Sequence, residues 1–397
     1  MDLTQLLAFT MQNKASDLHL SPANPAIIRV HGKLRRIKSD AHLSSDDIRS
    51  MLYSVMTEQQ RADFEKDMEL DFAISFGEKA RFRVNAFTTR NGCAAVFRTI
   101  PSEIPSFEDL DLPEVMRRFA ELDKGLVLVC GATGSGKSTT ISALVNHINQ
   151  TMDKHIITIE DPVEFVHHSK RSLVNHREVG RDTTSFSRAL KSALREDPDV
   201  ILVGELRDYE TMSLALTAAE TGHLVLASLH ANTAPKAIDR ILDVFPAGDK
   251  PMARTMLSSS LQGVVAQNLL PKADGGGRVG AFEILVGTSA VRNLIRENQI
   301  PQIYSMIQTG LRYGMTTMED YVTDLVDNGI VTKETARAVL SQVVEEGTTE
   351  VDSNSIRAGG GKPQTRAPEE ISTAPSAAKP AHSSAPPQDS GGGSYSF

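Results

Sequence analysis

Short apolar runs alternate with amphipathic stretches through the middle of the chain. From about Lys124 onward the runs are rich in Leu, Ile and Val, and apolar residues recur at helical spacing between most of them. Buried strands separated by helices are typical of a mainly parallel sheet that is covered on both faces. Residues 288–343 have a wholly helical pattern. We therefore expect an α/β domain, with strands over residues 125–130, 155–160, 200–204, 223–230 and 279–287.

The first hundred residues predict a second, smaller α/β domain. Ser44 and Asp47 fit the start of a capped helix, and apolar residues follow them at helical spacing. Prolines and acidic residues are dense over 101–115, which indicates an interdomain linker that leads into a helix near 113–121. Alternating apolar and polar positions predict strands over residues 26–31, 81–87 and 93–100.

The end of the chain has a different composition. Gly, Pro, Ser and Ala dominate residues 352–397, and the basic and acidic side chains there cancel. Such a stretch cannot bury enough apolar surface to offset the entropy lost on ordering, so we expect a disordered tail. The formal net charge of −8 then belongs to the residues before the tail.

Whole-chain composition narrows the class of protein. The 397 residues carry 42 Lys and Arg against 50 Asp and Glu, which argues against a protein that coats nucleic acid or an anionic membrane. Cys93 and Cys130 lie in apolar runs, so we expect buried thiols and no four-cysteine zinc site. No apolar run approaches the roughly 20 residues of a membrane helix, and the N-terminus lacks a basic region before its apolar stretch. We therefore expect a cytoplasmic protein with no direct membrane insertion.

The strongest chemical signal is the sequence GATGSGKST at 131–139, which matches a phosphate-binding loop between a strand and a helix. Its glycines let backbone N–H groups close around a polyphosphate, and the helix N-terminus favours negative charge. In this pattern Lys137 reaches the β- and γ-phosphates of ATP, and Ser138 binds Mg²⁺. The expected nucleotide-binding residues are Gly131, Ala132, Thr133, Gly134, Ser135, Gly136, Lys137, Ser138 and Thr139.

Two acidic elements are candidates for activating water. The strand over 155–160 is followed by Asp161 and Glu164, and the strand over 200–203 is followed by Gly204 and Glu205. Ligands collect at the C-terminal ends of strands in such sheets. Because the first strand lies in sequence between the phosphate loop and the second, an acid at its exit could face the γ-phosphate while Glu205 supports Mg²⁺. Each acid taken alone is equally well a solvated carboxylate at a strand end.

Histidines and arginines add further candidates. His230 is expected at a strand end, within reach of a phosphate or of the acids, whereas His223 is equally well a core histidine. Arg81 and Arg83 share one face of a predicted strand, and Arg98 lies on a neighbouring strand. An arginine supplied by another subunit can stabilise a transferring phosphoryl group, although this pattern alone more often marks a solvated strand face.

Together these residues resemble the secretion ATPase superfamily of hexameric motors, and within it the type IV pilus retraction ATPases. The resemblance covers about residues 1–345. The matching motifs are ASDLHL (15–20), RFRVNAF (81–87), VFRTIP (96–101), GATGSGKSTT (131–140), TIEDPVEFVH (158–167), SALREDPDVILVGELRD (192–208), TAAETGHLV (217–225) and AVRNLIRE (290–297).

The resemblance implies domains and residue roles. Glu164 corresponds to the base that activates water, Glu205 to the acid that supports Mg²⁺ together with Ser138, and His230 to the histidine box. Arg83 and Arg98 match N-terminal arginines that reach the nucleotide. No Asp-Glu pair ends the strand before Glu205, so the division of duties between the two glutamates stays open. The implied segments are a PAS-like domain over 1–100, a linker over 101–122, a RecA-like ATPase core over 123–287, a helical region over 288–345 and a tail over 346–397.

The resemblance also implies partners. These are a homohexamer, an inner-membrane pilus platform protein that recruits it to the cytoplasmic face at the pilus base, and a second retraction ATPase as a candidate. The helix at 290–297 is implicated in retraction, although its spacing alone fits an ordinary packing helix. The alternatives are an accessory retraction ATPase, a nucleotide-dependent scaffold with little turnover, and a DNA-translocating ATPase. Net acidity disfavours the last, so we expect no nucleic acid partner.

Overall fold

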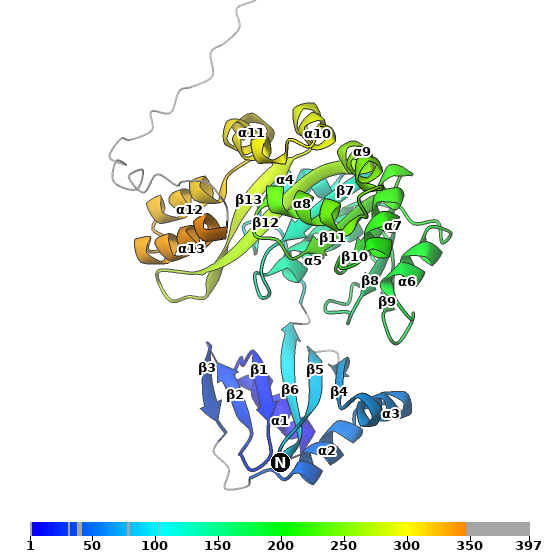
Figure 1. Ribbon diagram of the computed structural model, residues 1–397. Helices are drawn as coiled ribbons and strands as arrows, with labels where there is room; N and C mark the ends of the chain where they lie inside the picture. The colour runs from blue at the N-terminus through cyan, green and yellow to red at the C-terminus, as the bar shows by residue number, and fades with distance from the viewer. Residues whose placement is uncertain (1, 31, 38–41, 78–79, 102, 347–397) are drawn as a thin grey trace, which may run out of the picture. The chain divides into compact units, whose positions relative to one another are not determined.

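The computed structural model describes residues 2–30, 32–37, 42–77, 80–101 and 103–346 (Figure 1). The predicted tail lies outside these residues apart from Glu346, which ends the last described helix. The strands described here form two separate sheets. Over the same residues, no helix combines the length and the apolar character needed to cross a lipid bilayer.

The N-terminal sheet is antiparallel throughout, with strand order β3-β2-β1-β6-β5-β4. Ser44 caps α2 and Asp47 completes the capping box, as predicted. The strands expected over 26–31, 81–87 and 93–100 are confirmed as β2, β5 and β6. β1, β3 and β4 were not predicted; β3, for example, has three basic residues among its four, which is not a strand signal. The elements are α1 (Leu3–Gln12), β1 (Asp17–Leu20), β2 (Ile27–Val30), β3 (Lys33–Arg36), α2 (Ser45–Tyr53), α3 (Glu58–Asp67), β4 (Glu69–Phe76), β5 (Ala80–Thr89) and β6 (Gly92–Pro101).

The two faces of this sheet differ in polarity. Phe82, Val84 and Phe97 are fully buried and pack in one cluster with Leu6 of α1 and Ile48 of α2. The intervening positions of β5 and β6 point the other way, because side chains alternate along a strand. That second face carries the predicted arginines, and it is therefore the polar side of the sheet.

The second sheet is parallel except for its last strand pair, which confirms the predicted α/β class. Its order is β13-β12-β7-β11-β10-β8-β9, with β12 and β13 antiparallel. All five expected strands are present. β9 and β12 were not predicted, because the last four residues of β9 are polar and β12 is interrupted by Gln262 and Gly263. The strands are β7 (Gly125–Cys130), β8 (His155–Glu160), β9 (Leu173–Glu178), β10 (Val200–Val203), β11 (Leu224–Leu229), β12 (Leu261–Pro271) and β13 (Arg278–Val286).

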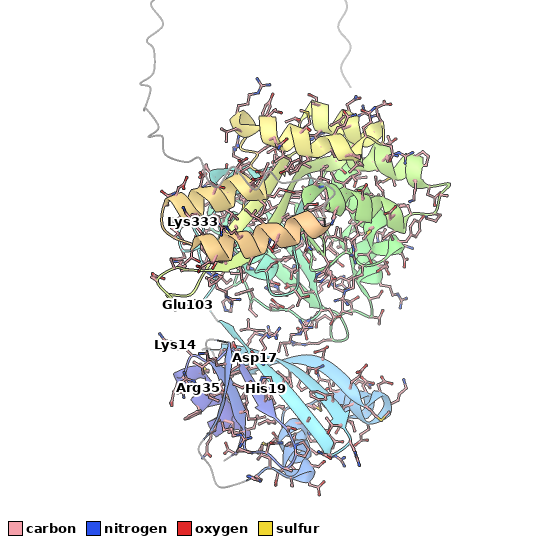
Figure 2. All side chains as sticks on the ribbon, turned by 60° about the vertical axis from the view of Figure 1, so that its left-hand side comes forward. Lys14, Asp17, His19, Arg35, Glu103 and Lys333 are labelled. Atoms are coloured by element: carbon pink, nitrogen blue, oxygen red, sulfur yellow. The ribbon has the colours of Figure 1, made fainter. Side chains whose placement is uncertain are left out.

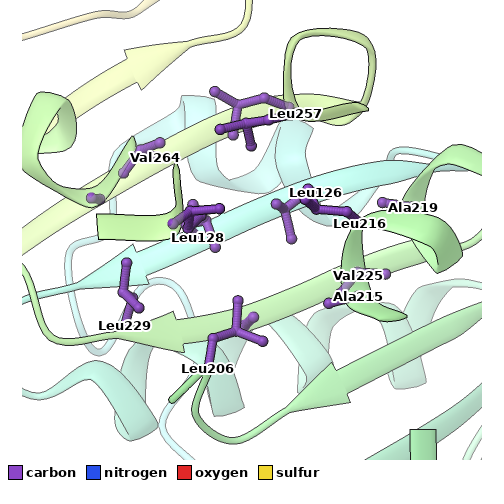
Figure 3. Close-up of a cluster of buried hydrophobic side chains, with 14 of the residues drawn as sticks. Leu126, Leu128, Leu206, Ala215, Leu216, Ala219, Val225, Leu229, Leu257 and Val264 are labelled. Atoms are coloured by element: carbon purple, nitrogen blue, oxygen red, sulfur yellow. The ribbon is translucent and has the colours of Figure 1, made fainter. Parts of the chain in front are cut away.

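Helices cover both faces of this sheet. The first face packs α7, α8 and α9 in a large apolar cluster, in which Leu126, Val225 and Val264 of three strands meet Leu216 of α7 and Leu257 of α9 (Figure 3). The second face packs against α4 and α5. The helices are α4 (Glu114–Ala120), α5 (Lys137–Thr151), α6 (Phe186–Ala193), α7 (Tyr209–Glu220), α8 (Ala234–Val244) and α9 (Lys250–Ser260).

The described residues after β13 form mainly helices, as expected, joined by short turns. In one of these turns Thr316 makes an isolated bridge to β13. Val291 and Ile295 of the AVRNLIRE segment are fully buried. Arg292 donates hydrogen bonds to the Gly287 and Ser259 carbonyls and to the Gln262 side chain. This segment therefore has a packing role in the subunit. The elements are α10 (Ser289–Arg296), η1 (Ile300–Gln302), α11 (Ile303–Thr309), η2 (Leu311–Tyr313), α12 (Met318–Asp327) and α13 (Lys333–Glu346).

One carboxyl group lies inside the core of the second sheet. Glu283 of β13 is 1% exposed, and its Oε1 accepts a hydrogen bond from the backbone N–H of Ala234, at the start of α8, at 2.7 Å. Burial raises the pKa of Glu283 to about 7, and the Ala234 hydrogen bond offsets only part of that rise. Between pH 4.5 and about 7, the folded state therefore retains a proton on Glu283 that the unfolded chain releases.

We predict that this carboxyl group makes folding stability fall as pH rises. Between the ordinary pKa of 4.5 and about 7, the folded state binds more protons than the unfolded chain, so each step up in pH favours unfolding. Glu283→Gln keeps an acceptor for Ala234 and removes the titration. The variant should gain about 2 to 3 kcal/mol relative to wild type between pH 5 and pH 8, measured by denaturant unfolding. An equal difference at both pH values would contradict the prediction.

Candidate functional site

The phosphate-binding loop joins β7 to α5 and packs tightly against β12. Gly131, Gly134 and Gly136 all have positive φ, which glycine adopts without strain. A Cβ added at Gly131 would lie 2.4 Å from the Gln267 carbonyl oxygen, and one at Gly136 would lie 2.8 Å from Gln267 Nε2. Thr140 also donates a hydrogen bond to Gln267 Oε1 at 2.7 Å. The loop is therefore held in shape from beneath by a residue that the sequence analysis missed.

The polar groups of this loop suit a phosphate ligand. Lys137 Nζ donates to the carbonyls of Gly131 and Ala132 at 2.9 and 3.0 Å, so the ammonium group lies over the loop. Burial lowers the pKa of Lys137, while Glu205, Cys130 and Glu164 act to raise it. Ser135 Oγ is buried and has no hydrogen-bond partner among the described residues. A buried hydroxyl without a partner and a buried ammonium group are groups whose hydrogen bonds an anion would satisfy.

Glu205 and His230 meet at the exits of two neighbouring strands. Glu205 follows β10 and His230 follows β11, which pairs in parallel with β10. His230 Nε2 lies 3.2 Å from Glu205 Oε1, and Arg207 Nη2 lies 2.6 Å from Glu205 Oε2. Burial would raise the pKa of Glu205, but Arg207, His230 and Lys137 together lower it. Glu205 is therefore an ionised carboxylate able to accept a cation.

The strand order in space differs from the order along the chain. In sequence, β8 lies between the phosphate loop and β10, whereas in the sheet β11 separates β7 from β10. His230 therefore lies at the exit between the loop and Glu205. β8 pairs on the far side of β10, and its exit leads to Asp161 and Glu164.

Glu164 lies in the segment after β8 and faces an arginine of the N-terminal sheet. Its side chain is 32% exposed, and Oε1 lies 3.7 Å from Arg83 Nη1. Burial raises the pKa of the nearby Asp161, and the positive charges of Arg207 and Arg83 oppose that rise. These interactions show that Asp161, Glu164 and Glu205 share one electrostatic environment with Lys137.

The two predicted arginines have different surroundings. Arg83 and Arg98 lie directly opposite each other on β5 and β6. Arg83 faces Glu164, but Arg98 Nε donates to Asp17 Oδ1 at 3.0 Å, and that carboxylate is 8% exposed. Asp17 shares β1 with His19 (Figure 2). The structure thus brings Lys137, Glu164, Glu205, His230 and Arg83 together and leaves Arg98 bound within the N-terminal sheet.

The structure also gives the surroundings of the remaining residues that the sequence singled out. Cys93 and Cys130 are buried free thiols, as predicted. His223 Nδ1 lies 3.0 Å from the Ala218 carbonyl oxygen, at the opposite end of β11 from His230, which agrees with a structural histidine. Ser138 is exposed at the start of α5. In the described parts of the chain, no group of three or more His, Cys, Asp or Glu side chains is arranged to hold a metal ion by itself.

Arg207 and Gln267 are the functional candidates that sequence reasoning did not select. Arg207 lies two positions after Glu205 in the motif GELRD, so its proximity to an acid was available as a signal. Gln267 gave no signal, because its contact with Thr140 joins residues 127 positions apart.

Comparison with known proteins agrees with this geometry. The family model described as "Type II/IV secretion system protein" matches residues 1–356. The type IV pilus retraction ATPase PilT of Pseudomonas aeruginosa is 55% identical over 85% of this chain and 97% of its own length. A twitching motility protein of Neisseria gonorrhoeae is 53% identical over 84% of this chain and 89% of its own length. The type IV pilus ATPase PilU of P. aeruginosa is 40% identical over 85% of this chain and 88% of its own length.

A solved structure has the same fold. A crystal structure of the pilus retraction motor PilT with bound ADP matches with a TM-score of 0.78 and 45% identity, over 85% of this chain and 97% of that one. Identity at this level over nearly the full length of these relatives is far above the level at which only fold is shared. The chain therefore belongs to the type II/IV secretion system protein family and is an ATPase of that family.

Proposed function

We propose that this ATPase is the motor that retracts type IV pili. The observation that carries the proposal is the convergence of the phosphate loop, Glu164 and Glu205 at one sheet edge in a chain 55% identical to a pilus retraction ATPase. The ATPase would act as a homohexamer on an inner-membrane platform protein, at the cytoplasmic face of the pilus base. A second retraction ATPase is a candidate partner in the same machine, and nucleic acid is not.

The chemistry follows from the placement of the charged groups. Loop N–H groups and Lys137 would hold the β- and γ-phosphates, because phosphate oxygens are stronger acceptors than the carbonyls that Lys137 contacts in the structure. Mg²⁺, held through Ser138 and Glu205, would neutralise phosphate charge when bound. Glu164 would orient water and accept its proton, and Arg83, whose Nη1 lies 3.7 Å from Glu164 Oε1, would help to hold the carboxylate in position.

Arg98 has a separate role in this proposal. Its contact with Asp17 keeps it on the polar face of the N-terminal sheet, and 62% of its side chain is exposed. We infer that this guanidinium group completes the nucleotide site of a neighbouring subunit in the ring, where it would stabilise charge on the transferring phosphoryl group. Movement of the N-terminal domain would then couple hydrolysis in one subunit to the position of the next.

The cellular role has a direct test. Deletion of the gene should leave abundant, static pili and abolish twitching, because assembly continues while disassembly stops. Imaging of labelled pili measures both properties. A deletion strain without pili would indicate an extension motor and would refute the proposal.

The chemical roles of Lys137 and Glu164 separate in a binding and turnover assay. Lys137→Ala should weaken ATP binding and reduce turnover by roughly 100-fold or more, because the phosphates lose their buried cation. Glu164→Gln should reduce turnover by about 100- to 1000-fold and leave ADP affinity near wild type. Asp153→Asn, which changes an exposed carboxylate paired with Arg171, is the control and should be normal. Near-normal turnover in either test variant would refute the role given to that residue.

Mixed rings test whether Arg98 acts on a neighbouring subunit. Arg98→Ala and Glu164→Gln should each be inactive alone. In a mixed ring, some sites combine an intact Glu164 with an intact Arg98 from the adjacent chain, so random mixing should restore about a quarter of the wild-type rate. If Arg98 acted on its own subunit, mixing would restore nothing, since neither chain carries both groups.

A further inference from the structure

The loop that carries Glu164 has no regular secondary structure of its own. Residues 161–172, between β8 and β9, form neither helix nor strand. A carboxylate that must meet a water molecule beside a phosphate has to be held within a fraction of an ångström, because small displacements reduce catalysis strongly. The contacts that fix this loop are therefore important for the reaction.

Two side chains of β9 hold the loop on either side of Glu164. Glu178 Oε2 accepts a hydrogen bond from the backbone N–H of Val163 at 3.0 Å. His176 Nε2 accepts one from the backbone N–H of His167 at 3.0 Å. Because His176 and Glu178 are two positions apart on a strand, their side chains point to the same face. Hydrogen bonds therefore hold the loop backbone at Val163, one residue before Glu164, and at His167, three residues after it.

The histidine contact extends to the helix that follows the phosphate loop. His176 Nδ1 lies 2.8 Å from Thr158 Oγ1 of β8, and His176 Nε2 also lies 3.2 Å from the carbonyl oxygen of His167. The imidazole rings of His167 and His176 stack with centroids 5.9 Å apart. His167 Nε2 in turn lies 3.3 Å from Ser142 Oγ of α5. Burial, followed by the neighbouring His176, lowers the pKa of His167 to about 3, so its ring stays neutral.

We propose that His176 and Glu178 are positioning residues that hold Glu164 in register with the phosphate loop. Neither touches the nucleotide site directly, and each acts through the backbone of the loop. The proposal rests on the role given to Glu164 in the proposed function. It gives β9, a strand without a motif for ATP chemistry, a part in the reaction.

The glutamate contact also links the loop to the N-terminal sheet. Arg81 Nη2 lies 3.6 Å from Glu178 Oε2, the same oxygen that accepts from Val163. Burial raises the pKa of Glu178, and the Val163 hydrogen bond and the Arg81 charge oppose the rise. Displacement of Arg81 would remove a positive charge beside the Glu178 carboxylate, which holds the Glu164 loop through Val163. Movement of the N-terminal sheet can therefore reach Glu164 through Glu178.

The test uses a pair of substitutions at His176 in the full-length protein. His176→Leu removes both hydrogen bonds and should lower kcat by about 10- to 100-fold, with ADP affinity unchanged within about twofold. His176→Gln offers an acceptor and a donor and should restore kcat to within about threefold of wild type. Asn175→Ala, an exposed position on the same strand, is the matched control and should be normal.

A second pair of substitutions, at Glu178, tests the other contact independently. Glu178→Ala should lower kcat by about 10- to 100-fold, whereas Glu178→Gln keeps an acceptor for Val163 and should retain most of the activity. Thermal unfolding is measured on every variant, so that loss of folded protein is separated from loss of turnover. Equal loss in the Leu and Gln variants of His176, or a parallel fall in ADP affinity, would overturn the positioning role.

A double variant separates this proposal from the one it rests on. If His176 acts through Glu164, then His176→Leu should change the residual rate of Glu164→Gln by less than about twofold. A further large loss of turnover in the Glu164→Gln background would overturn the positioning role of His176. Normal turnover in Glu164→Gln alone would refute the proposed role of Glu164. An inactive Glu164→Gln together with a normal His176→Leu would refute only the positioning role of His176.

Discussion

The parallel pairing of β7, β11, β10 and β8 is the constraint on which the site depends. Val127, Leu226, Leu202 and Thr158 lie in line across these four strands. The C-terminal ends of parallel strands lie at the same edge of a sheet, so the four segments that follow these strands begin side by side. The phosphate loop, His230, Glu205 and the Glu164 loop are these four exits.

The charged groups at that edge differ in the partners that they contact. Glu205 is paired with Arg207 and His230, and Glu164 with Arg83. Among the described residues, the hydrogen bonds of Lys137 Nζ go to neutral carbonyls of its own loop. The ammonium group can therefore transfer to a phosphate without breaking an ion pair. In the proposed function, phosphate binding would offset the cost of burying this ammonium group, because opposite charges interact more strongly where water is excluded.

Contacts outside the sheet edge determine how rigidly each group is held. Gln267 of β12 packs under the glycines of the phosphate loop, and two side chains of β9 hold the loop of Glu164. Arg292 of the AVRNLIRE segment joins α10 to the Gln262 side chain, which also donates to the carbonyl before β7. These three groups come from parts of the chain without a nucleotide motif, yet each supports an element that bears one.

Local sequence patterns were enough to predict the fold class, most strands of the second sheet, the phosphate loop and four of its polar neighbours, because these features depend on residues close together in the chain. A continuous apolar run predicts a buried strand wherever it occurs, and GATGSGKST requires its glycines for reasons internal to the loop. The pairing of the strands in three dimensions establishes which of the strand exits are adjacent. It placed β11 and His230 between the loop and Glu205, and it gave Arg83 and Arg98 different partners although both were predicted to reach the nucleotide. Strand order and ion pairing depend on residues far apart in the chain, and no local pattern records them.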